Sequence, residues 1–301
     1  MDVSIVIVSY NAREVLATCL AAVADGPWEV IVVDNASTDG SQALVRERFP
    51  SVRLLEPGAN LGFGPANNVG MRAASGRWVL LLNSDAWPID DGVERLVAVA
   101  ERHPGAGIVG PRLRNPDGTL QRSVRGFPTV WRICTEYLFL RKLGPRTRLF
   151  NAFYGAGFDH ESEREAEFLK GAVLLLRREA LDAVGGFDER YFMFSEEVDL
   201  CYRLRQAGWS TVFTPEAEFV HVGGASTAAE WGRMYRHQVR GHLLFLSLHR
   251  GPRTAERARR WLLRALRLRA LAFRGERGRT YADAARWLAS GDAAALLQSR
   301  E

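Results

Sequence analysis

Three side chains that lie far apart in the sequence could carry chemistry: Asp85, Glu197 and His221. Asp85 ends the motif Asn83-Ser84-Asp85, which follows the apolar strand pattern of residues 77–82. A strand of valine and leucine that ends on an aspartate places a carboxylate at the edge of a sheet, where a hard cation carrying a diphosphate could bind. A single aspartate after a strand is ordinarily a turn former, and that alternative stays open here.

A second candidate site lies at the start of a predicted helix, where Glu196 and Glu197 stand side by side. Glu197 precedes the apolar Leu200 by three residues, so its carboxylate should lean toward the buried side of the helix, where a cleft would lie. Asp199 and Arg203 can pair across one turn on a more exposed side. The alternative is that these acids are structural, because the helix dipole favours carboxylates in a first turn.

The third candidate, His221, stands near the end of a strand pattern over residues 218–222. A lone histidine is more often an ordinary hydrogen-bonded side chain than a metal ligand. A ligand role for His221 therefore requires that Asp85 face the same cleft.

The elements that must position these side chains alternate between strands and helices. Helix patterns separate strand patterns at residues 3–9, 29–33, 52–55, 77–82 and 108–111. Such alternation predicts an α/β fold with a mostly parallel sheet that has helices on both faces. Ligands collect at the carboxyl ends of such strands, which here carry Tyr10-Asn11 and Asp34-Asn35.

The segment Gly62-Phe63-Gly64-Pro65-Ala66-Asn67 nearly matches the glycine-rich dinucleotide fingerprint. The third glycine is missing and the segment follows the third strand rather than the first, so a dinucleotide oxidoreductase is excluded. The helix start can still contact a phosphate or a ribose.

The character of the sequence changes after residue 115. We expect a strand over residues 119–125, an amphipathic helix over 129–142, a mobile surface loop near the site over 144–167, and strands over 210–213 and 218–222.

Composition bounds the class of protein. The 301 residues are 47% hydrophobic, which suits one large or two fused globular cores. The first ten residues enter a strand pattern directly, and no window resembles a membrane span, so we expect a cytoplasmic protein. Three widely spaced cysteines in apolar contexts predict buried, reduced thiols rather than a disulfide framework or a zinc cluster: Cys19, Cys134 and Cys201.

Positive charge is concentrated toward the C-terminus. Residues 250–279 hold eleven arginines against two glutamates, a local net charge of +9, which leaves −4 for the rest of a chain whose total is +5. Arg260, Arg264 and Arg267 form one stripe of a predicted amphipathic helix over residues 253–273, as in helices that lie on anionic bilayers. A packing helix with a solvated arginine face is the alternative. No recognition motif supports nucleic-acid binding.

Six motifs, in order, give the chain a family resemblance. They are SIVIVSYN at residues 4–11, VVDNASTDGS at 32–41, NLGFGPANNVGM at 60–71, LLNSDAWP at 81–88, GGFDERYFMFSEEVDLCYRLRQAGW at 185–209 and HVGGAS at 221–226. Over residues 3–249 the chain resembles the family 2 glycosyltransferases, in particular bacterial rhamnosyltransferase-like members. The resemblance implies a GT-A (Rossmann-like) α/β fold, with a mostly parallel central sheet flanked by helices and a C-terminal helical tail.

By the same resemblance, the chain transfers a sugar with inversion from a nucleotide-diphosphate donor, assisted by Mn²⁺ or Mg²⁺. Asp85 matches the last aspartate of the metal-binding DXD motif, and His221 matches the histidine that completes the metal site. Glu197 matches the catalytic base, and Glu196 stands beside it. Two departures are visible: Asn83-Ser84-Asp85 keeps one carboxylate of DXD, and glutamate replaces aspartate as the base.

The resemblance also implies binding residues. Asp34 and Asn35 match positions that hold the base and ribose. The full set expected to bind the nucleotide sugar is Ser9, Tyr10, Asn11, Asp34, Asn35, Asn60, Gly62, Asn67, Asn83, Ser84 and Asp85. The candidates for the acceptor side are Lys170, Gly171 and Trp209.

The implied organisation has three parts: a nucleotide-sugar-binding half (1–114), an acceptor and catalytic half of the same domain (115–249), and a basic helical tail (250–301). The expected donor is a dTDP- or UDP-sugar, with rhamnose preferred. The expected acceptor is a cell-surface or lipid-linked glycan, with peripheral membrane contact through residues 250–279 at the inner face of the plasma membrane.

Two other classes stay open. A nucleotidyltransferase should carry a glycine-rich, basic phosphate loop after the first strand, where this chain has Ser9-Tyr10-Asn11-Ala12-Arg13. A non-catalytic nucleotide-sugar-binding scaffold is compatible with the reduced DXD motif.

Overall fold

A computed structural model describes residues 2–223 and 231–290 of the chain. The chain forms two compact units. Unit 1 comprises Met1–Val124, Asp159–Phe192 and Glu196–Ala228, and unit 2 comprises Arg125–Phe158, Met193–Ser195 and Ala229–Glu301. Every predicted site residue belongs to unit 1, whereas residues 224–226 of the HVGGAS motif lie outside the described residues. The three-part division of the chain stays a prediction.

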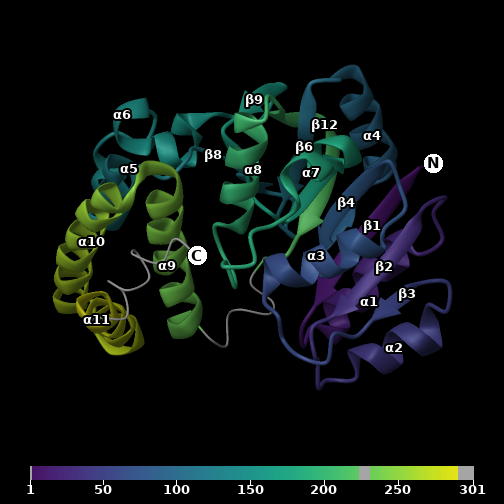
Figure 1. Cartoon of the computed structure of the whole chain (residues 1–301), viewed down its shortest axis with the longest axis horizontal. Helices are drawn as coiled ribbons and strands as arrows, with labels where there is room; N and C mark the ends of the chain where they lie inside the picture. Colours follow the sequence, from purple (N-terminus) through teal and green to yellow (C-terminus); the bar gives the residue numbers. More distant parts are fainter. Residues whose placement is uncertain (1, 224–230, 291–301) are drawn as a thin grey trace. The chain divides into compact units, whose positions relative to one another are not determined.

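Unit 1 is built on a ten-stranded mixed sheet (Figure 1). In spatial order its strands are β3 (Arg53–Leu55), β2 (Glu29–Asp34), β1 (Val3–Ser9), β4 (Trp78–Asn83), β11 (Val173–Arg177), β6 (Ala106–Arg114), β12 (Ser210–His221) and β5 (Ala86–Pro88), with β7 (Leu120–Gln121) beside β6 and β9 (Arg164–Ala166) beside β12. The strands β3, β2, β1 and β4 are parallel, and β11 runs antiparallel to both β4 and β6. The mostly parallel α/β sheet expected from the sequence is confirmed. Two short strands, β8 (Val124–Arg125) and β10 (Phe168–Leu169), lie outside it.

Helices cover both faces of this sheet. Those of unit 1 are α1 (Arg13–Val23), α2 (Ser41–Arg48), α3 (Phe63–Ala73), α4 (Gly92–Arg102), α7 (Arg178–Val184) and α8 (Glu196–Gln206). Val32 of β2 packs in one core cluster with Leu16 of α1, whereas its neighbour Val33 packs in another with Ala66 of α3. Successive strand residues face opposite sides, so α1 and α3 lie on opposite faces. Each fully buried side chain of this kind contributes about 1.5–3 kcal/mol relative to an exposed one.

The strands expected at 210–213 and 218–222 are one continuous strand, β12, so that prediction was wrong. β12 runs parallel to β6, with a register irregularity between Thr214 and Glu218. The extra residues of such a bulge are absorbed without ending the strand, which the interrupted apolar pattern did not reveal. One consequence is that a single rigid element carries His221 to the edge of the sheet.

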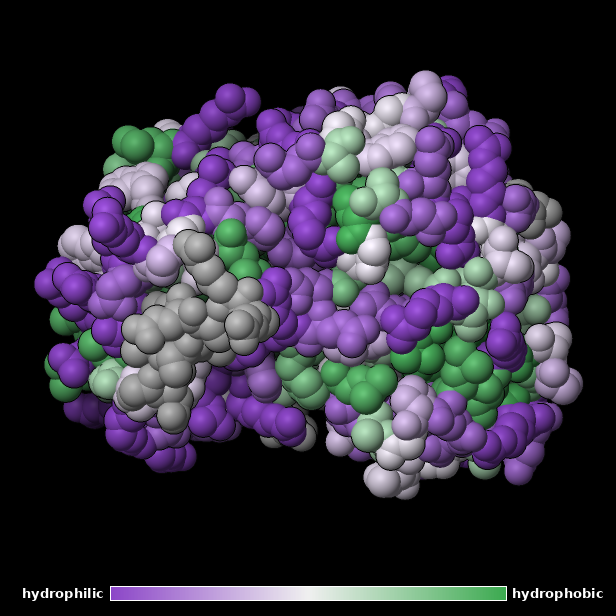
Figure 2. Space-filling view, viewed as in Figure 1, coloured by the Kyte–Doolittle hydropathy of each residue, from purple (hydrophilic) through white to green (hydrophobic). Residues whose placement is uncertain are grey.

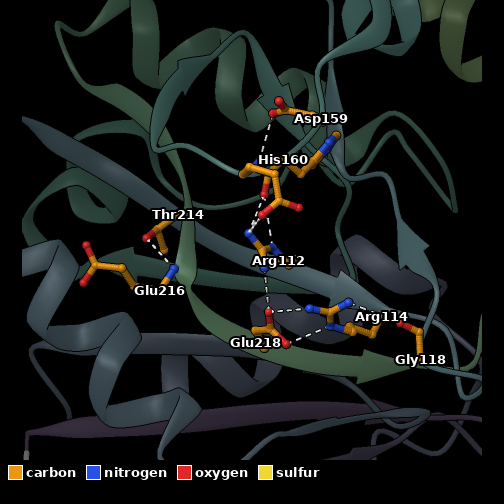
Figure 3. A network of polar contacts seen from close by, with 9 residues as sticks. Arg112, Arg114, Gly118, Asp159, His160, Thr214, Glu216 and Glu218 are labelled. Carbon is orange, nitrogen blue, oxygen red and sulfur yellow. Dashed lines mark hydrogen bonds and ion pairs between the residues drawn. The ribbon is translucent and has the colours of Figure 1, made fainter.

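A network of charged groups stabilises β12 beyond this irregularity (Figure 3). The Glu218 carboxylate accepts hydrogen bonds from Arg114 Nε and Nη2, each at 2.8 Å, and from Arg112 Nη1 at 2.9 Å. The Arg114 hydrogen bond is the main reason why the pKa of Glu218 lies below its ordinary value. Arg112 also donates to the carbonyl oxygen of His160 at 2.9 Å. The network therefore ties the last residues of β12 to β6 and to the chain before β9.

Residues 144–167 are not the surface loop expected from the sequence. They contain α6 (Arg148–Asn151), the 3-10 helix η2 (Ala152–Gly157) and β9, and the His160 side chain is fully buried. Its Nε2 accepts hydrogen bonds from the backbone N–H groups of Ser123 and Val124, at 3.2 and 3.3 Å. The many charges of this segment suggested a solvated loop, but two of them bind partners distant in sequence: Glu161 pairs with Arg112 and Glu163 with His103.

Unit 2 is mainly helical. Its helices are α5 (Val130–Tyr137), η1 (Leu140–Leu143), α6, η2, α9 (Trp231–Arg250), α10 (Pro252–Ala272) and α11 (Gly275–Ala289). The helix expected over 129–142 is thus divided into α5 and η1 at Phe139, whose φ is 59°. Arg269 of α10 is 8% exposed, lies 4.1 Å from the Phe139 ring centroid and donates to the carbonyl oxygen of Tyr137 at 2.7 Å. One tail arginine is therefore a core residue.

The stability of unit 2 should depend on pH through His242 of α9. This side chain is 5% exposed, its Nδ1 has no hydrogen-bond partner within the described residues, and burial lowers its pKa to about 4. The unfolded chain binds this proton near the ordinary value of 6.5, so stability is complete above pH 6.5 and falls as the pH drops toward 4. We expect a loss of about 3 kcal/mol over that window, measured by urea unfolding.

Replacement of His242 by phenylalanine should flatten this pH dependence, because it keeps an aromatic ring against Phe153 and Tyr137. The matched control is His103→Phe, which alters a more exposed histidine of unit 1. An unchanged acid profile in His242→Phe would contradict the assignment.

Candidate functional site

The carboxyl ends of β1 and β2 meet at one edge of the sheet. The backbone N–H of Asn35 donates to the carbonyl oxygen of Ser9 at 2.8 Å. Asp34 Oδ1 accepts from the Ser37 N–H at 2.9 Å and from Gln42 Nε2 at 2.6 Å. Ser9 Oγ and Asp34 Oδ2 are buried and have no hydrogen-bond partner within the described residues. These two atoms are the polar groups at this edge that a bound nucleotide could satisfy.

The loops that follow β1 and β2 fix one another. Asn11, with φ of 47°, accepts a hydrogen bond from the Thr38 N–H on its Oδ1 at 2.8 Å and donates from its own N–H to Ser37 Oγ at 2.9 Å. Tyr10 precedes it and is half-buried. The predicted residues of these loops therefore lie together, with Asn11 used to shape the loop.

A second set of amides shapes the loop before α3. Asn35 Nδ2 donates to Asn60 Oδ1 at 3.0 Å and to the Gly62 carbonyl oxygen at 2.9 Å. Gly62 has φ of 89°, and a Cβ there would lie 2.2 Å from the carbonyl oxygen of Phe192, so only glycine fits. Asn67 donates to the Phe63 carbonyl oxygen one turn back in α3. The amides of Asn35 and Asn67 are thus occupied by the protein itself.

The carboxyl end of β4 brings Asn83, Asp85 and His221 together. Asp85 Oδ1 lies 3.3 Å from His221 Nε2, and Asn83 Nδ2 lies 3.3 Å from the same nitrogen. β12 pairs antiparallel with β5 so that His221 stands opposite Ala86, next to Asp85. Ser84 between them is buried. A ligand role for His221 required Asp85 to face the same place. In the structure the two side chains do lie together.

This cluster fits a divalent cation in part. Within residues 2–223 and 231–290, no three His, Cys, Asp or Glu side chains come together as a complete metal site. Asn83 Oδ1, however, is buried and has no hydrogen-bond partner there. Asp85, His221 Nε2 and this amide oxygen would supply part of a coordination shell, and a hard cation commonly completes its shell with substrate phosphate and water.

The α8 helix begins with two glutamates whose side-chain stems lie beside two glycines. A Cβ on Gly64 of α3 would lie 3.4 Å from Glu196 Cβ, and one on Gly171, just before β11, would lie 3.5 Å from Glu197 Cβ. The same Gly171 position lies 3.8 Å from a ring carbon of Phe63. Glu197 therefore reaches the edge where Asn83 bonds through its N–H to the carbonyl oxygen of Ala172, at 2.9 Å.

The two glutamates differ in environment. Glu196 is 4% exposed, and burial, together with the charge of Glu197, raises its pKa well above the ordinary value. Glu197 is only half-buried. Asp199 pairs with Arg203 at 2.6 Å as expected, but the expected exposure was wrong, because Asp199 is 1% exposed. Arg203 also donates to the carbonyl oxygens of Val184 and Gly186, which places the pair inside the fold.

A glutamine at position 196 should stabilise the protein at alkaline pH. Since the folded-state pKa is raised above 4.5, wild-type stability is complete below that pH and declines as the pH rises toward the folded pKa. Glu196→Gln keeps the neutral form and its shape, so its melting temperature should exceed that of the wild type at pH 8, and the difference should shrink at pH 5. Glu179→Gln, in the first turn of α7, is the control. A less stable glutamine variant at pH 8 would show that Glu196 is ionised.

Of the predicted acceptor residues, Lys170 and Gly171 lie at this edge and Trp209 does not. Lys170 Nζ donates to Gln121 Oε1 at 2.8 Å, and Gln121 contacts His221. Trp209 immediately precedes β12, at the opposite end of the strand from His221, and a Cβ added to Gly107 of β6 would lie 2.9 Å from the Trp209 Cβ. Gln121 was missed by the sequence reasoning, since nothing distinguishes it within a short strand.

Comparisons with known proteins agree with this architecture. Residues 4–185 match the model of Glycosyl transferase family 2. The chain is 38% identical over 240 residues to N-acetylglucosaminyl-diphospho-decaprenol L-rhamnosyltransferase of Mycobacterium tuberculosis H37Rv, a match that covers 75% of this chain and 78% of that protein. It is 23% identical over 264 residues to rhamnosyltransferase WbbL of Escherichia coli K12, covering 82% and 94%.

Solved structures share the fold. The mannosyltransferase PcManGT of Pyrobaculum calidifontis, in complex with GDP-Man and Mn²⁺, aligns with a TM-score of 0.54 at 19% identity, over 98% of this chain and 80% of that one. Staphylococcus aureus TarS 1–349, in complex with UDP-GlcNAc, aligns with a TM-score of 0.56 at 16% identity, over 98% and 84%. The expected GT-A fold is confirmed. The chain belongs to glycosyltransferase family 2 and is a glycosyltransferase.

Proposed function

We propose that this enzyme transfers L-rhamnose, with inversion, from a dTDP-rhamnose donor to a hydroxyl group of a lipid-linked glycan. The choice of rhamnose and of a lipid-linked acceptor is supported by the 38% identity to a relative whose name specifies both a diphospho-decaprenol substrate and L-rhamnosyl transfer. The proposal extends to a location at the inner face of the plasma membrane.

The observation that carries the proposal is the convergence of three distant side chains on one sheet edge. Glu197 lies against Gly171, the neighbouring Lys170 contacts Gln121 and His221, and His221 faces Asp85. The cluster supplies a carboxylate at Glu197 and a cation-coordinating group at Asp85 and His221. An inverting displacement needs this pair, because the base and the departing diphosphate act on opposite sides of the sugar carbon.

Each residue then has a proposed role. Ser9 Oγ and Asp34 Oδ2 satisfy the nucleoside, since both are buried polar atoms without partners in the described chain. Asp85, His221 and Asn83 hold the cation, which would offset the charge that grows on the leaving diphosphate. Glu197 accepts the proton of the acceptor hydroxyl. Burial raises the pKa of Glu196 and so favours its protonated form, which leaves Glu197 as the adjacent carboxylate that serves as the base.

A donor panel tests the proposed function. The wild-type enzyme is incubated with dTDP-, UDP- and GDP-sugars and an alkyl-diphospho-GlcNAc acceptor, with Mn²⁺, with Mg²⁺ or with a chelator. We expect the release of dTDP from dTDP-rhamnose, dependent on both acceptor and metal. Nucleotidyl transfer from such a donor breaks the bond between its two phosphates, so release of a sugar 1-phosphate would favour the nucleotidyltransferase, and release of nothing from any donor would favour the non-catalytic scaffold.

Membrane contact is proposed for the outward face of α10. Trp261, Leu268 and Leu271 are exposed to 43, 58 and 85%. They repeat at spacings of seven and three residues, so they share one helix face with exposed arginines at 253, 257, 260, 264 and 267. Figure 2 shows hydrophobic residues that interrupt the hydrophilic surface in the region of α10 and α11. No helix within the described ranges is long and apolar enough to cross a bilayer.

Replacing Arg264 and Arg267 with glutamine should weaken binding to anionic vesicles. Each basic residue near an anionic surface contributes about 1 kcal/mol, so we expect roughly a 30-fold loss in the partition coefficient, measured by co-sedimentation with vesicles of phosphatidylglycerol and phosphatidylcholine. Arg46→Gln with Arg53→Gln, two exposed arginines of unit 1, is the control. Equal binding by both double variants would exclude this face, which would then be a solvated arginine surface.

A further inference from the structure

The two ring nitrogens of His221 face groups of different chemistry. Nε2 lies 3.3 Å from Asp85 Oδ1 and 3.3 Å from Asn83 Nδ2. Nδ1 lies 2.6 Å from the side-chain oxygen Oε1 of Gln121. A neutral imidazole carries its proton on one nitrogen only, and the tautomer is set by the partners of the ring. Which nitrogen keeps a lone pair therefore depends on which way the Gln121 amide points.

Three contacts fix the orientation of that amide. Gln121 Nε2 lies 2.8 Å from Asn115 Oδ1 and 3.0 Å from the carbonyl oxygen of His221, both of which are acceptors. Gln121 Oε1 lies 2.8 Å from Lys170 Nζ, which can only donate. If the amide were rotated by half a turn, its oxygen would face two acceptors and its NH₂ group would face a donor. The atom that faces His221 Nδ1 is therefore an oxygen, and Nδ1 must carry the proton.

We propose that Gln121 is a positioning residue that holds His221 in the Nδ1–H tautomer and so presents the Nε2 lone pair to the cation bound with the donor. The inference rests on the proposed function, because the cation that His221 would bind is the one proposed to accompany the donor. With Nδ1 protonated and Nε2 bare, His221 Nε2 can accept from Asn83 Nδ2 at 3.3 Å, whereas Nε2 and Asp85 Oδ1 are two acceptors 3.3 Å apart with no proton between them. A cation resolves such an arrangement, and a metal-bound histidine ordinarily donates its other ring N–H to an oxygen that orients it.

The support for Gln121 comes from elements that are distant in sequence. β7 carries Gln121 and pairs antiparallel with β6, with Gln121 opposite Leu113, and Lys170 is held through its N–H to the carbonyl oxygen of Ser123 at 3.0 Å. The Lys170 ammonium lies 3.4 Å from His221 Nδ1, but two donors cannot bond, so its partner is the shared Gln121 oxygen. We therefore assign Lys170 the role of supporting His221 through Gln121.

The tautomer can be read directly in the metal-free protein. In a long-range ¹H–¹⁵N spectrum of ¹⁵N-histidine-labelled enzyme at pH 8, the pattern of ring nitrogen shifts distinguishes Nδ1–H, Nε2–H and doubly protonated rings. The His221 signals are identified by their loss in His221→Ala. His160 provides an internal reference, since its Nε2 accepts two backbone hydrogen bonds and its ring must also be Nδ1–H. We expect the same pattern for His221.

Variants separate positioning from mere folding. Gln121→Leu removes the acceptor, so the His221 ring should shift toward the Nε2–H form, and Mn²⁺ affinity measured by calorimetry should fall on the order of 10- to 100-fold. Gln121→Glu keeps an oxygen at Nδ1 and should retain the wild-type tautomer and an affinity close to the wild-type value. Gln206→Leu, the same replacement at an exposed position of α8, should change neither.

An Nε2–H or doubly protonated His221 in the wild-type protein would overturn the inference, and so would an unchanged tautomer in folded Gln121→Leu. The ring measurement needs neither metal nor substrate. If the tautomer is as expected while no donor is turned over, the proposed function fails and the assignment of Gln121 as the residue that orients His221 stands.

Discussion

Replacement of Glu197 by glutamine is expected to lower the turnover number by roughly 10²- to 10⁴-fold, the usual contribution of a general base. The glutamine keeps the shape of the side chain beside Gly171 but cannot accept the proton of the acceptor hydroxyl. Donor binding should survive, because the residues proposed to hold the nucleotide lie at the ends of β1 and β2. Turnover is measured as nucleoside diphosphate release with a saturating acceptor, and donor affinity by calorimetry.

The matched control is Glu179→Gln, which alters an exposed glutamate in the first turn of α7 and should leave turnover unchanged. Glu197→Asp should retain part of the activity, because it keeps a carboxylate with a reach shorter by one methylene. Near-normal turnover in Glu197→Gln would remove Glu197 from the role of base.

Replacement of Asp85 by asparagine should have the second large effect. Asp85 places a carboxylate beside His221 Nε2, so its loss weakens the hold on a cation that offsets leaving-group charge. Such charge stabilisation is worth several kcal/mol, which corresponds to a fall of roughly 10²- to 10³-fold in kcat/KM. The requirement for Mn²⁺ should also move to higher concentration, as measured by metal titration of the initial rate.

Asp117→Asn is the control for Asp85→Asn, since Asp117 is exposed and its carboxylate serves the turn through Thr119. An Asp85→Asn enzyme with wild-type rate and wild-type metal titration would show that the cation is not held here.

The strand ends of the candidate site could be predicted from the sequence, because their signal is local. Runs of valine, isoleucine and leucine that stop at Ser9, Asp34 and Asn83 mark both the buried strands and their polar ends. In parallel strands these ends must lie at the same edge. The pattern also predicted that α8 begins with acids, although not which of them is buried.

The rest depended on pairing between distant segments. β11 runs antiparallel between β4 and β6, and this reversal brings Lys170 and Gly171 to the carboxyl end of β4. Nothing in the apolar run of residues 173–176 specifies its direction. The same holds for Trp209, which precedes the parallel strand β12 and so lies at the opposite end from His221.

Charged residues misled the sequence reasoning where their partners are remote. Asp199 was expected on an exposed side, but it is buried because Arg203 pairs with it and also binds the carbonyl oxygens of Val184 and Gly186. Arg112 and Arg114 in the same way bind Glu218, which lies within β12 rather than at the start of a separate strand. Burial of a charge requires a partner, and the sequence does not name the partner.

The account is tested most directly by the product of the wild-type enzyme with dTDP-rhamnose, an alkyl-diphospho-GlcNAc acceptor and Mn²⁺, analysed by NMR spectroscopy. The account predicts a rhamnoside whose anomeric configuration is opposite to that of the donor, formed with one nucleoside diphosphate per rhamnosyl group. A rhamnoside that retains the donor configuration, or release of rhamnose 1-phosphate in place of the nucleoside diphosphate, would contradict it.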